Sequence, residues 1–101
     1  MRLVIVSCPP HEADTLLSTL LDERHVGCGN IVPGVRSRYW WQGRICVDEE
    51  ALLLMETEAA RVPALLERVR ALHSYEVPKV LVVPVEATLP AYAGWLRSVL
   101  G

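Results

Sequence analysis

Residues 30–58 read NIVPGVRSRYWWQGRICVDEEALLLMETE, and this stretch decides the fold. Two runs rich in Val, Ile, Tyr and Trp flank Gln42-Gly43, a composition that is typical of paired β-strands. Gly43 can adopt the positive φ angle that a two-residue hairpin turn requires. Each arm is about a dozen residues long, roughly twice the usual strand length. The stretch therefore predicts a β-hairpin that overhangs a small domain, and an overhanging apolar ribbon usually pairs with another chain.

Two short segments are expected to interrupt this hairpin. Pro33 cannot donate a ladder hydrogen bond, so Pro33-Gly34 predicts a bulge in the first arm. Asp48-Glu49-Glu50 is expected to interrupt the second arm. These three carboxylates could bind a hard cation. Alternatively, they form a solvated bulge that keeps a strand edge from pairing with other chains.

The rest of the chain supplies two strands and three helices around the hairpin. Continuous β-branched runs at residues 3–6 and 79–85 predict strands, and apolar residues at helical spacing predict helices over 13–21, 62–72 and 89–99. The order is βαββαβ followed by a C-terminal helix. It predicts a single α+β domain over residues 1–101, with a ferredoxin-like antiparallel sheet that carries helices on one face. A second subunit can cover the other face.

Composition narrows the classes of protein to which the chain can belong. The 101 residues are 51% hydrophobic, with a mean hydropathy of +0.27, which is apolar for so small a chain and points to a partner subunit. The net charge of −2, without a basic stripe, argues against nucleic-acid binding, and no apolar run is long enough for a membrane span. Three cysteines without a C-x-x-C pair argue against a disulfide framework. We therefore expect a cytoplasmic protein.

Four segments together resemble one known family. CGNIVPGV (28–35), RYWWQGRI (38–45), EALLLMET (50–57) and LHSYEVPKVLVVPV (72–85) are similar to the signature segments of the CutA divalent-cation-tolerance proteins. The resemblance implies a ferredoxin-like subunit in a tight homotrimer, similar in architecture to the PII signalling proteins, with the long hairpins paired between subunits. It also implies a role in tolerance of divalent metal ions, copper above all.

The sequence departs from the family pattern at two charged positions. Glu56 stands where the family generally has Lys, and Lys79 stands where it generally has Glu. Breaking one partner of a partly buried ion pair is costly, so a joint reversal is the tolerated change. We therefore expect the two positions to face each other, and a subunit boundary could lie between them.

Candidate metal ligands are the soft donors Cys8, Cys28 and His73, which suit copper or another divalent metal. The resemblance implies a Cys at the end of the first strand and a His-His pair, but Ser7 takes the Cys position here and Leu72 replaces the first His. Packing of the thiols in the core and a helix-capping role for His73 remain the alternatives.

A small-molecule cleft between subunits is the other candidate site. Aromatic side chains with a few polar groups often line such clefts, and the candidates are Asn30, Trp40, Trp41, Glu56, Tyr75 and Lys79. Packing in the core or at the subunit interface is the alternative reading of the aromatic residues. No nucleophile motif, phosphate loop or zinc-protease motif is present, so we expect no enzyme. A metal-binding trimer, a PII-like sensor of an anionic or aromatic ligand, and a trimeric scaffold for a partner protein remain open.

Overall fold

A computed structural model describes residues 1–101. Its elements are β1 (Arg2–Cys8), α1 (Ala13–Asp22), β2 (Cys28–Trp41), β3 (Arg44–Thr57), α2 (Val62–Leu72), β4 (Val80–Pro84) and α3 (Pro90–Leu100), with short 3-10 helices at Pro10–Glu12 and Ala59–Arg61. The order confirms the predicted α+β, ferredoxin-like arrangement with a C-terminal helix. None of the three α-helices combines the length and the apolar character needed to cross a membrane.

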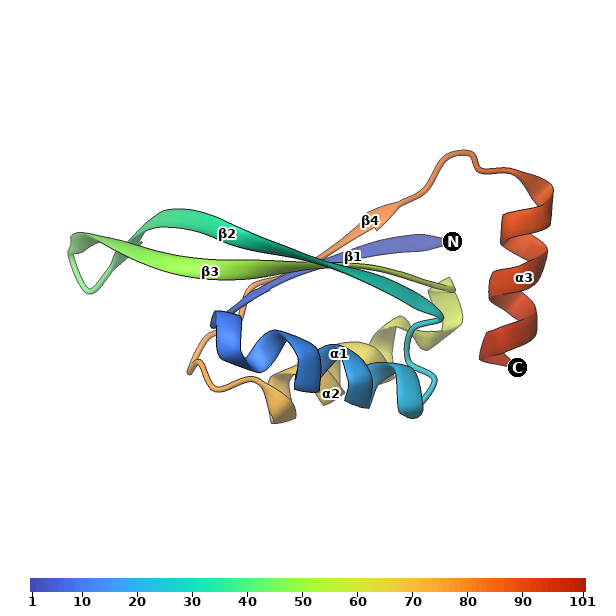
Figure 1. The fold of residues 1–101 in the computed structure, drawn as a ribbon, viewed down its shortest axis with the longest axis horizontal. Coiled ribbons are helices and arrows are strands. Elements are labelled where there is room, and N and C mark those ends of the chain that lie inside the picture. Colours follow the sequence, from blue (N-terminus) through green and yellow to red (C-terminus); the bar gives the residue numbers. More distant parts are fainter.

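The four strands form one antiparallel sheet in the order β2-β3-β1-β4. Cys8 at the end of β1 lies opposite Ala51 of β3, so the part of β3 before Ala51 extends past β1. Figure 1 shows α1 and α2 on one face of the sheet, the β2–β3 hairpin extending beyond them, and α3 standing at the opposite end. The hairpin gives the molecule its longest dimension, 45 Å against 25 and 22 Å.

The core lies between the sheet and the two helices. Side chains of a strand alternate between its two faces. Val4, Val6, Leu53 and Met55 point toward the helices and are fully buried there, together with Leu20 of α1. The same alternation sends the intervening residues to the other face of the sheet.

The other face, called the open sheet face below, is apolar and only half-buried. Leu81 and Val83 of β4 remain 48% and 41% exposed. Half-buried side chains of β1 and β3 lie between them and β2, namely Leu3, Ile5, Leu52 and Leu54. Neither α1 nor α2 covers this face (Figure 1). A patch of this kind usually marks an interaction surface.

The hairpin follows the prediction at its turn and at its bulge. Gln42 and Gly43 both have positive φ angles, 50° and 79°, as a turn of type I′ requires. The register shifts between Val32 and Val35, at the predicted Pro33-Gly34 bulge, and Gly34 takes a φ of 70°.

The expected interruption at Asp48-Glu49-Glu50 is wrong, because β3 runs unbroken through these residues. Glu49 lies opposite Arg36 in the register, and an opposite-charge pair across two strands is favourable. Asp48 and Glu49 are exposed and need no desolvation, whereas Glu50 is only 5% exposed and therefore has to be hydrogen-bonded.

Candidate functional site

A cavity of about 660 Å³ lies between the hairpin and the connector that joins α2 to β4. Residues 37–41 of β2 form one wall, and residues 74–77 with Lys79 form the other. Ser7 and Glu50 complete the lining. We call this cavity the hairpin cleft. Its size is within the range of small-molecule sites.

Hydrogen bonds fix the connector against the sheet. The hydroxyl of Tyr75 donates to Oε2 of the buried Glu50 over 2.8 Å. His73 follows the last residue of α2, and its Nε2 lies 2.7 Å from the carbonyl oxygen of Ser7, to which it donates. The backbone N–H of Tyr75 donates to Nδ1 of His73 over 3.1 Å. These bonds require the neutral His73 tautomer with its proton on Nε2, and they hold Tyr75 at the wall of the cleft.

Both tyrosines of the cleft are neutral at physiological pH. Burial, followed by the bond to Glu50, raises the pKa of Tyr75 above its usual range. The hydroxyl of Tyr39 donates to the carboxylate of Asp48, and this bond is the main cause that raises the pKa of Tyr39 to about 12. The hydroxyl of each tyrosine therefore donates a hydrogen bond to a carboxylate of β3. The ring of Tyr75 also contacts the ring of His73, with the two ring centroids 4.7 Å apart.

Two cationic side chains of the cleft have no partner within the chain. Arg38 and Lys79 are exposed and form none of the ion pairs in the structure. Trp40 and Trp41 stand beside them, 72% and 39% exposed. Exposed indole rings next to free cations can hold a flat ring by stacking and an anionic group by charge. The arrangement fits a planar anionic small molecule.

The structure brings together four of the six residues that were expected to form a ligand cleft. Trp40, Trp41, Tyr75 and Lys79 line the hairpin cleft, whereas Asn30 and Glu56 do not. Sequence reasoning missed Arg38, Ser7 and Glu50. A basic residue two positions before Trp40, within one strand run, was the available signal for Arg38, because side chains at i and i+2 share a face.

Asn30 and Glu56 lie on the sheet away from the hairpin cleft. Asn30 is opposite Leu54, and Glu56 is opposite Leu3 near the start of β1. The hydroxyl of Tyr92 in α3 donates to Oε1 of Glu56 over 3.2 Å, while Oε2 is buried without a hydrogen-bond partner. Within one chain, therefore, Glu56 and Lys79 do not face each other.

The candidate metal ligands also lie apart. Cys8 is fully buried beneath the helices, and burial, with smaller effects of Glu12 and Glu50, raises the pKa of its thiol to about 11. Cys28 lies opposite Glu56, five residues farther along β3 than Ala51, the partner of Cys8. The two cysteines are thus roughly 17 Å apart along the sheet and on opposite faces.

His73 offers no free ring nitrogen as a metal ligand beside either cysteine, because both of its ring nitrogens are engaged in hydrogen bonds. Nowhere in the chain do three or more His, Cys, Asp or Glu side chains gather in a way that could hold a metal ion. The donors of a single chain therefore do not fit a copper site built from Cys8, Cys28 and His73.

Comparison with known proteins gives one consistent family. The profile of the family described as CutA1 divalent ion tolerance protein matches residues 2–99. A divalent-cation tolerance protein CutA of Thermus thermophilus is 42% identical over 101 residues, which cover 99% of this chain and 98% of that protein. Protein CutA of Mus musculus is 38% identical over 93% of this chain but only 54% of its own length. The chain thus spans about half the length of that relative.

Solved structures of the same family share the fold over nearly the whole chain. The Cut A1 protein from Thermus thermophilus superposes with a TM-score of 0.95 at 42% identity and covers 100% of both chains. CutA1 from Oryza sativa gives a TM-score of 0.94 at 35% identity, over 97% of this chain and 91% of that one. A protein from Archaeoglobus fulgidus, described as a periplasmic divalent cation tolerance protein CutA, gives 0.95 at 26% identity over 100% of both chains.

Proposed function

The chain belongs to the CutA1 divalent ion tolerance protein family, and from this premise we propose that it serves divalent-cation tolerance as a homotrimeric, non-enzymatic binding protein. The observation that carries this proposal is the open sheet face. Its half-exposed leucines, isoleucine and valines cover one side of the sheet, where neither α1 nor α2 shields them from water. Burying such a face against other copies of the chain is favourable at about 25 cal/mol per Å².

The hairpin supports the same assembly. In the part of β3 that precedes Ala51, no strand lies on the side that β1 occupies elsewhere, and β2 is an edge strand along its whole length. Trp40, Ile45 and Val47 on this overhang are 72%, 59% and 58% exposed. Free strand edges with apolar side chains pair readily with another chain. We propose that neighbouring copies cover them.

The ligand of the proposed trimer is a planar anionic small molecule in the hairpin cleft. Support comes from the two exposed indole rings, from the free charge of Arg38, and from the hydrogen bonds that hold Tyr75 in place. Direct binding of copper or another divalent metal is the second candidate, which the family description favours. Metal binding would require donors from more than one copy.

A cytoplasmic location belongs to the same proposal. All three cysteines are free thiols, which suits a reducing compartment. The names of relatives include a chloroplastic and a periplasmic protein, so location varies within the family.

Native mass spectrometry of the reduced protein, with and without copper and zinc, tests assembly and metal binding together. We expect a trimer. Uptake of metal in steps of three would favour the metal candidate, and a trimer without metal would favour the cleft ligand. A monomer at micromolar concentration would contradict the proposed assembly.

The hairpin cleft is tested by titration with 2-naphthoate, a planar aromatic anion, in a Trp95→Phe background. That background leaves Trp40 and Trp41, both in the cleft, as the fluorescent reporters. We expect saturable quenching that Arg38→Ala weakens about tenfold and that Arg36→Ala leaves unchanged. Arg36 is the matched control because it lies on the same strand but outside the cleft. Equal effects of the two substitutions would contradict a site in the cleft.

A further inference from the structure

The open sheet face carries one acidic side chain and is bordered by one basic side chain. Over the length of β1, the residues on this face are apolar or uncharged except for Glu56, which lies opposite Leu3. Lys79 borders the opposite end, two residues before Leu81, and lines the hairpin cleft together with Ser7. The two charges therefore mark the two ends of one apolar surface.

The hydrogen bonding of the Glu56 carboxylate is incomplete within its own chain. Its Oε1 accepts one neutral hydrogen bond, from Tyr92, and its Oε2 is the only buried side-chain nitrogen or oxygen atom in the chain that has no partner. A buried oxygen without a partner loses its bonds to water and gains nothing in return. Because Glu56 as a whole is only half-buried, a rotation about its side-chain bonds can turn the carboxylate toward the open face.

Lys79 is the group of opposite charge, and it forms no ion pair within its own chain. It is the sole lysine of the sequence, it is exposed, and it makes no ion pair. Lys79 precedes Val83 by four residues, and Val83 lies in the same row of the sheet as Glu56. The strands of Val83 and Glu56, β4 and β3, are separated by β1. The two positions are thus about 13 Å apart along the strands and about 10 Å apart across them. An ion pair within one chain is excluded by this separation.

We propose that Lys79 of a second copy of this chain supplies the missing partner of Glu56 and that this pair sets the register of the subunit interface. The proposal rests on the self-assembly proposed above. In a head-to-tail contact, the basic end of the open face of one copy lies against the acidic end of the open face of the next copy. Each copy can then give its Lys79 to one neighbour and receive the Lys79 of another, so a ring closes with one pair per interface.

The pair has a specific physical role in this interface. Apolar contacts are non-directional, so the leucines and valines alone would accept several relative positions of two copies. An unpaired charge that is buried between two subunits is strongly unfavourable, and this cost rejects every position except the one that joins Glu56 to Lys79.

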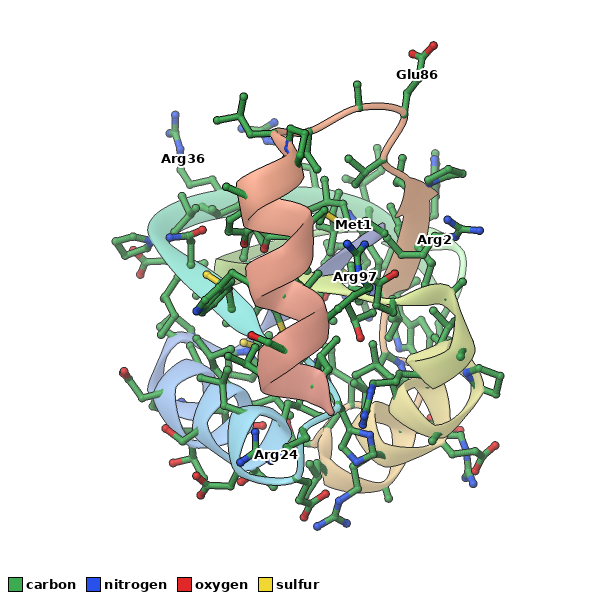
Figure 2. The ribbon with its side chains drawn as sticks, turned by 90° about the vertical axis from the view of Figure 1, so that its right-hand side faces the viewer. Met1, Arg2, Arg24, Arg36, Glu86 and Arg97 are labelled. Carbon is green, nitrogen blue, oxygen red and sulfur yellow. The ribbon has the colours of Figure 1, made fainter.

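Charge reversal tests the pair. We expect Glu56→Lys and Lys79→Glu each to raise the concentration at which the trimer half-dissociates by about tenfold or more, measured by analytical ultracentrifugation. The double variant E56K/K79E should restore assembly. Glu86→Lys is the control for a change of net charge, since Glu86 points away from the molecule on the loop before α3 (Figure 2). Single reversals that leave the trimer intact, or a double variant no better than the singles, would overturn the proposal.

A zero-length cross-link gives a readout that does not depend on stability. A water-soluble carbodiimide activates the Glu56 carboxylate, and the Lys79 amine displaces the urea to form an amide bond. Because Lys79 is the only lysine, we expect covalent dimers and trimers whose cross-linked peptide joins Lys79 to Glu56 and which disappear in Lys79→Arg. A trimer whose Lys79 couples only to other carboxylates would overturn the pair while leaving the assembly standing. A monomeric protein would overturn both.

Discussion

At the scale of single residues, Gly27, which directly precedes β2, lies close to side chains of α3. A Cβ atom at Gly27 would lie 2.5 Å from Cδ1 of Leu96 and 3.0 Å from Cγ2 of Val99. Leu96 is fully buried and cannot move aside freely. We expect Gly27→Ala to lower the free energy of unfolding by about 1–3 kcal/mol in a denaturant titration.

Gly94 provides the matched substitution for this prediction. It lies inside α3, and a Cβ there would meet no atom within 4 Å. Gly94→Ala should therefore raise the free energy of unfolding by about 0.5–1 kcal/mol, because glycine is a poor helix former. A shift of both variants in the same direction would contradict a steric contact at Gly27.

From the raised pKa of the Cys8 thiol we expect a loss of stability at alkaline pH. Burial raises its folded-state pKa from 9.0 to about 11, so the folded protein keeps the proton over a range in which the unfolded chain releases it. Stability from this group is fully present below pH 9 and declines as the pH rises toward 11. We expect the free energy of unfolding to fall as the pH rises from 9 toward 11 and to fall less in Cys8→Ala. Equal pH dependence of the two proteins would contradict this assignment.

At the scale of the element, the turn of the β2–β3 hairpin is limited by its backbone. Gln42 and Gly43 both have positive φ angles, and a Cβ at Gly43 would meet no other atom. The cost of Gly43→Ala is therefore conformational, about 1 kcal/mol or more. Gln42→Asn should instead stabilise the protein by roughly 0.5 kcal/mol, because Asn tolerates left-handed backbone better.

Thermal unfolding and amide hydrogen exchange check the turn prediction. The two variants should shift the midpoint in opposite directions, and faster exchange in Gly43→Ala should be confined to residues 39–46 around the turn. Faster exchange spread over the whole sheet would show that the hairpin does not open as a separate unit.

At the scale of the whole molecule, the open sheet face separates folding from assembly. Leu81 is 48% exposed in the single chain, so Leu81→Asp places a charge in water before assembly and in the apolar interface after it. We expect the variant to keep its far-UV circular dichroism and to elute as a monomer in size-exclusion chromatography with light scattering. Leu89→Asp is the control, since Leu89 is 74% exposed and precedes α3 outside this face. A trimer in both variants would place the interface elsewhere.

Local patterns determined the elements of this protein. Alternation and β-branched runs mark the strands, helical spacing marks the helices, and Gln42-Gly43 marks the turn, because each of these depends on neighbours within a few residues. The same local reasoning failed at Asp48-Glu49-Glu50. There, β3 is paired with β2 and Glu49 lies opposite Arg36 in the register, while Glu50 accepts a hydrogen bond from Tyr75, which is distant in sequence.

Only the tertiary structure decided which candidate residues meet. Trp40 and Tyr75 line one cleft because the β2–β3 hairpin extends past the end of β1, which leaves room beside β3 for the connector between α2 and β4. Cys8 and Cys28 are kept apart by strand register, which no local pattern specifies and which assigns every side chain to a face of the sheet. In the same way, register places Glu56 and Lys79 at opposite ends of one face. The sequence by itself therefore determined the elements and their order, while long-range pairing determined the sites.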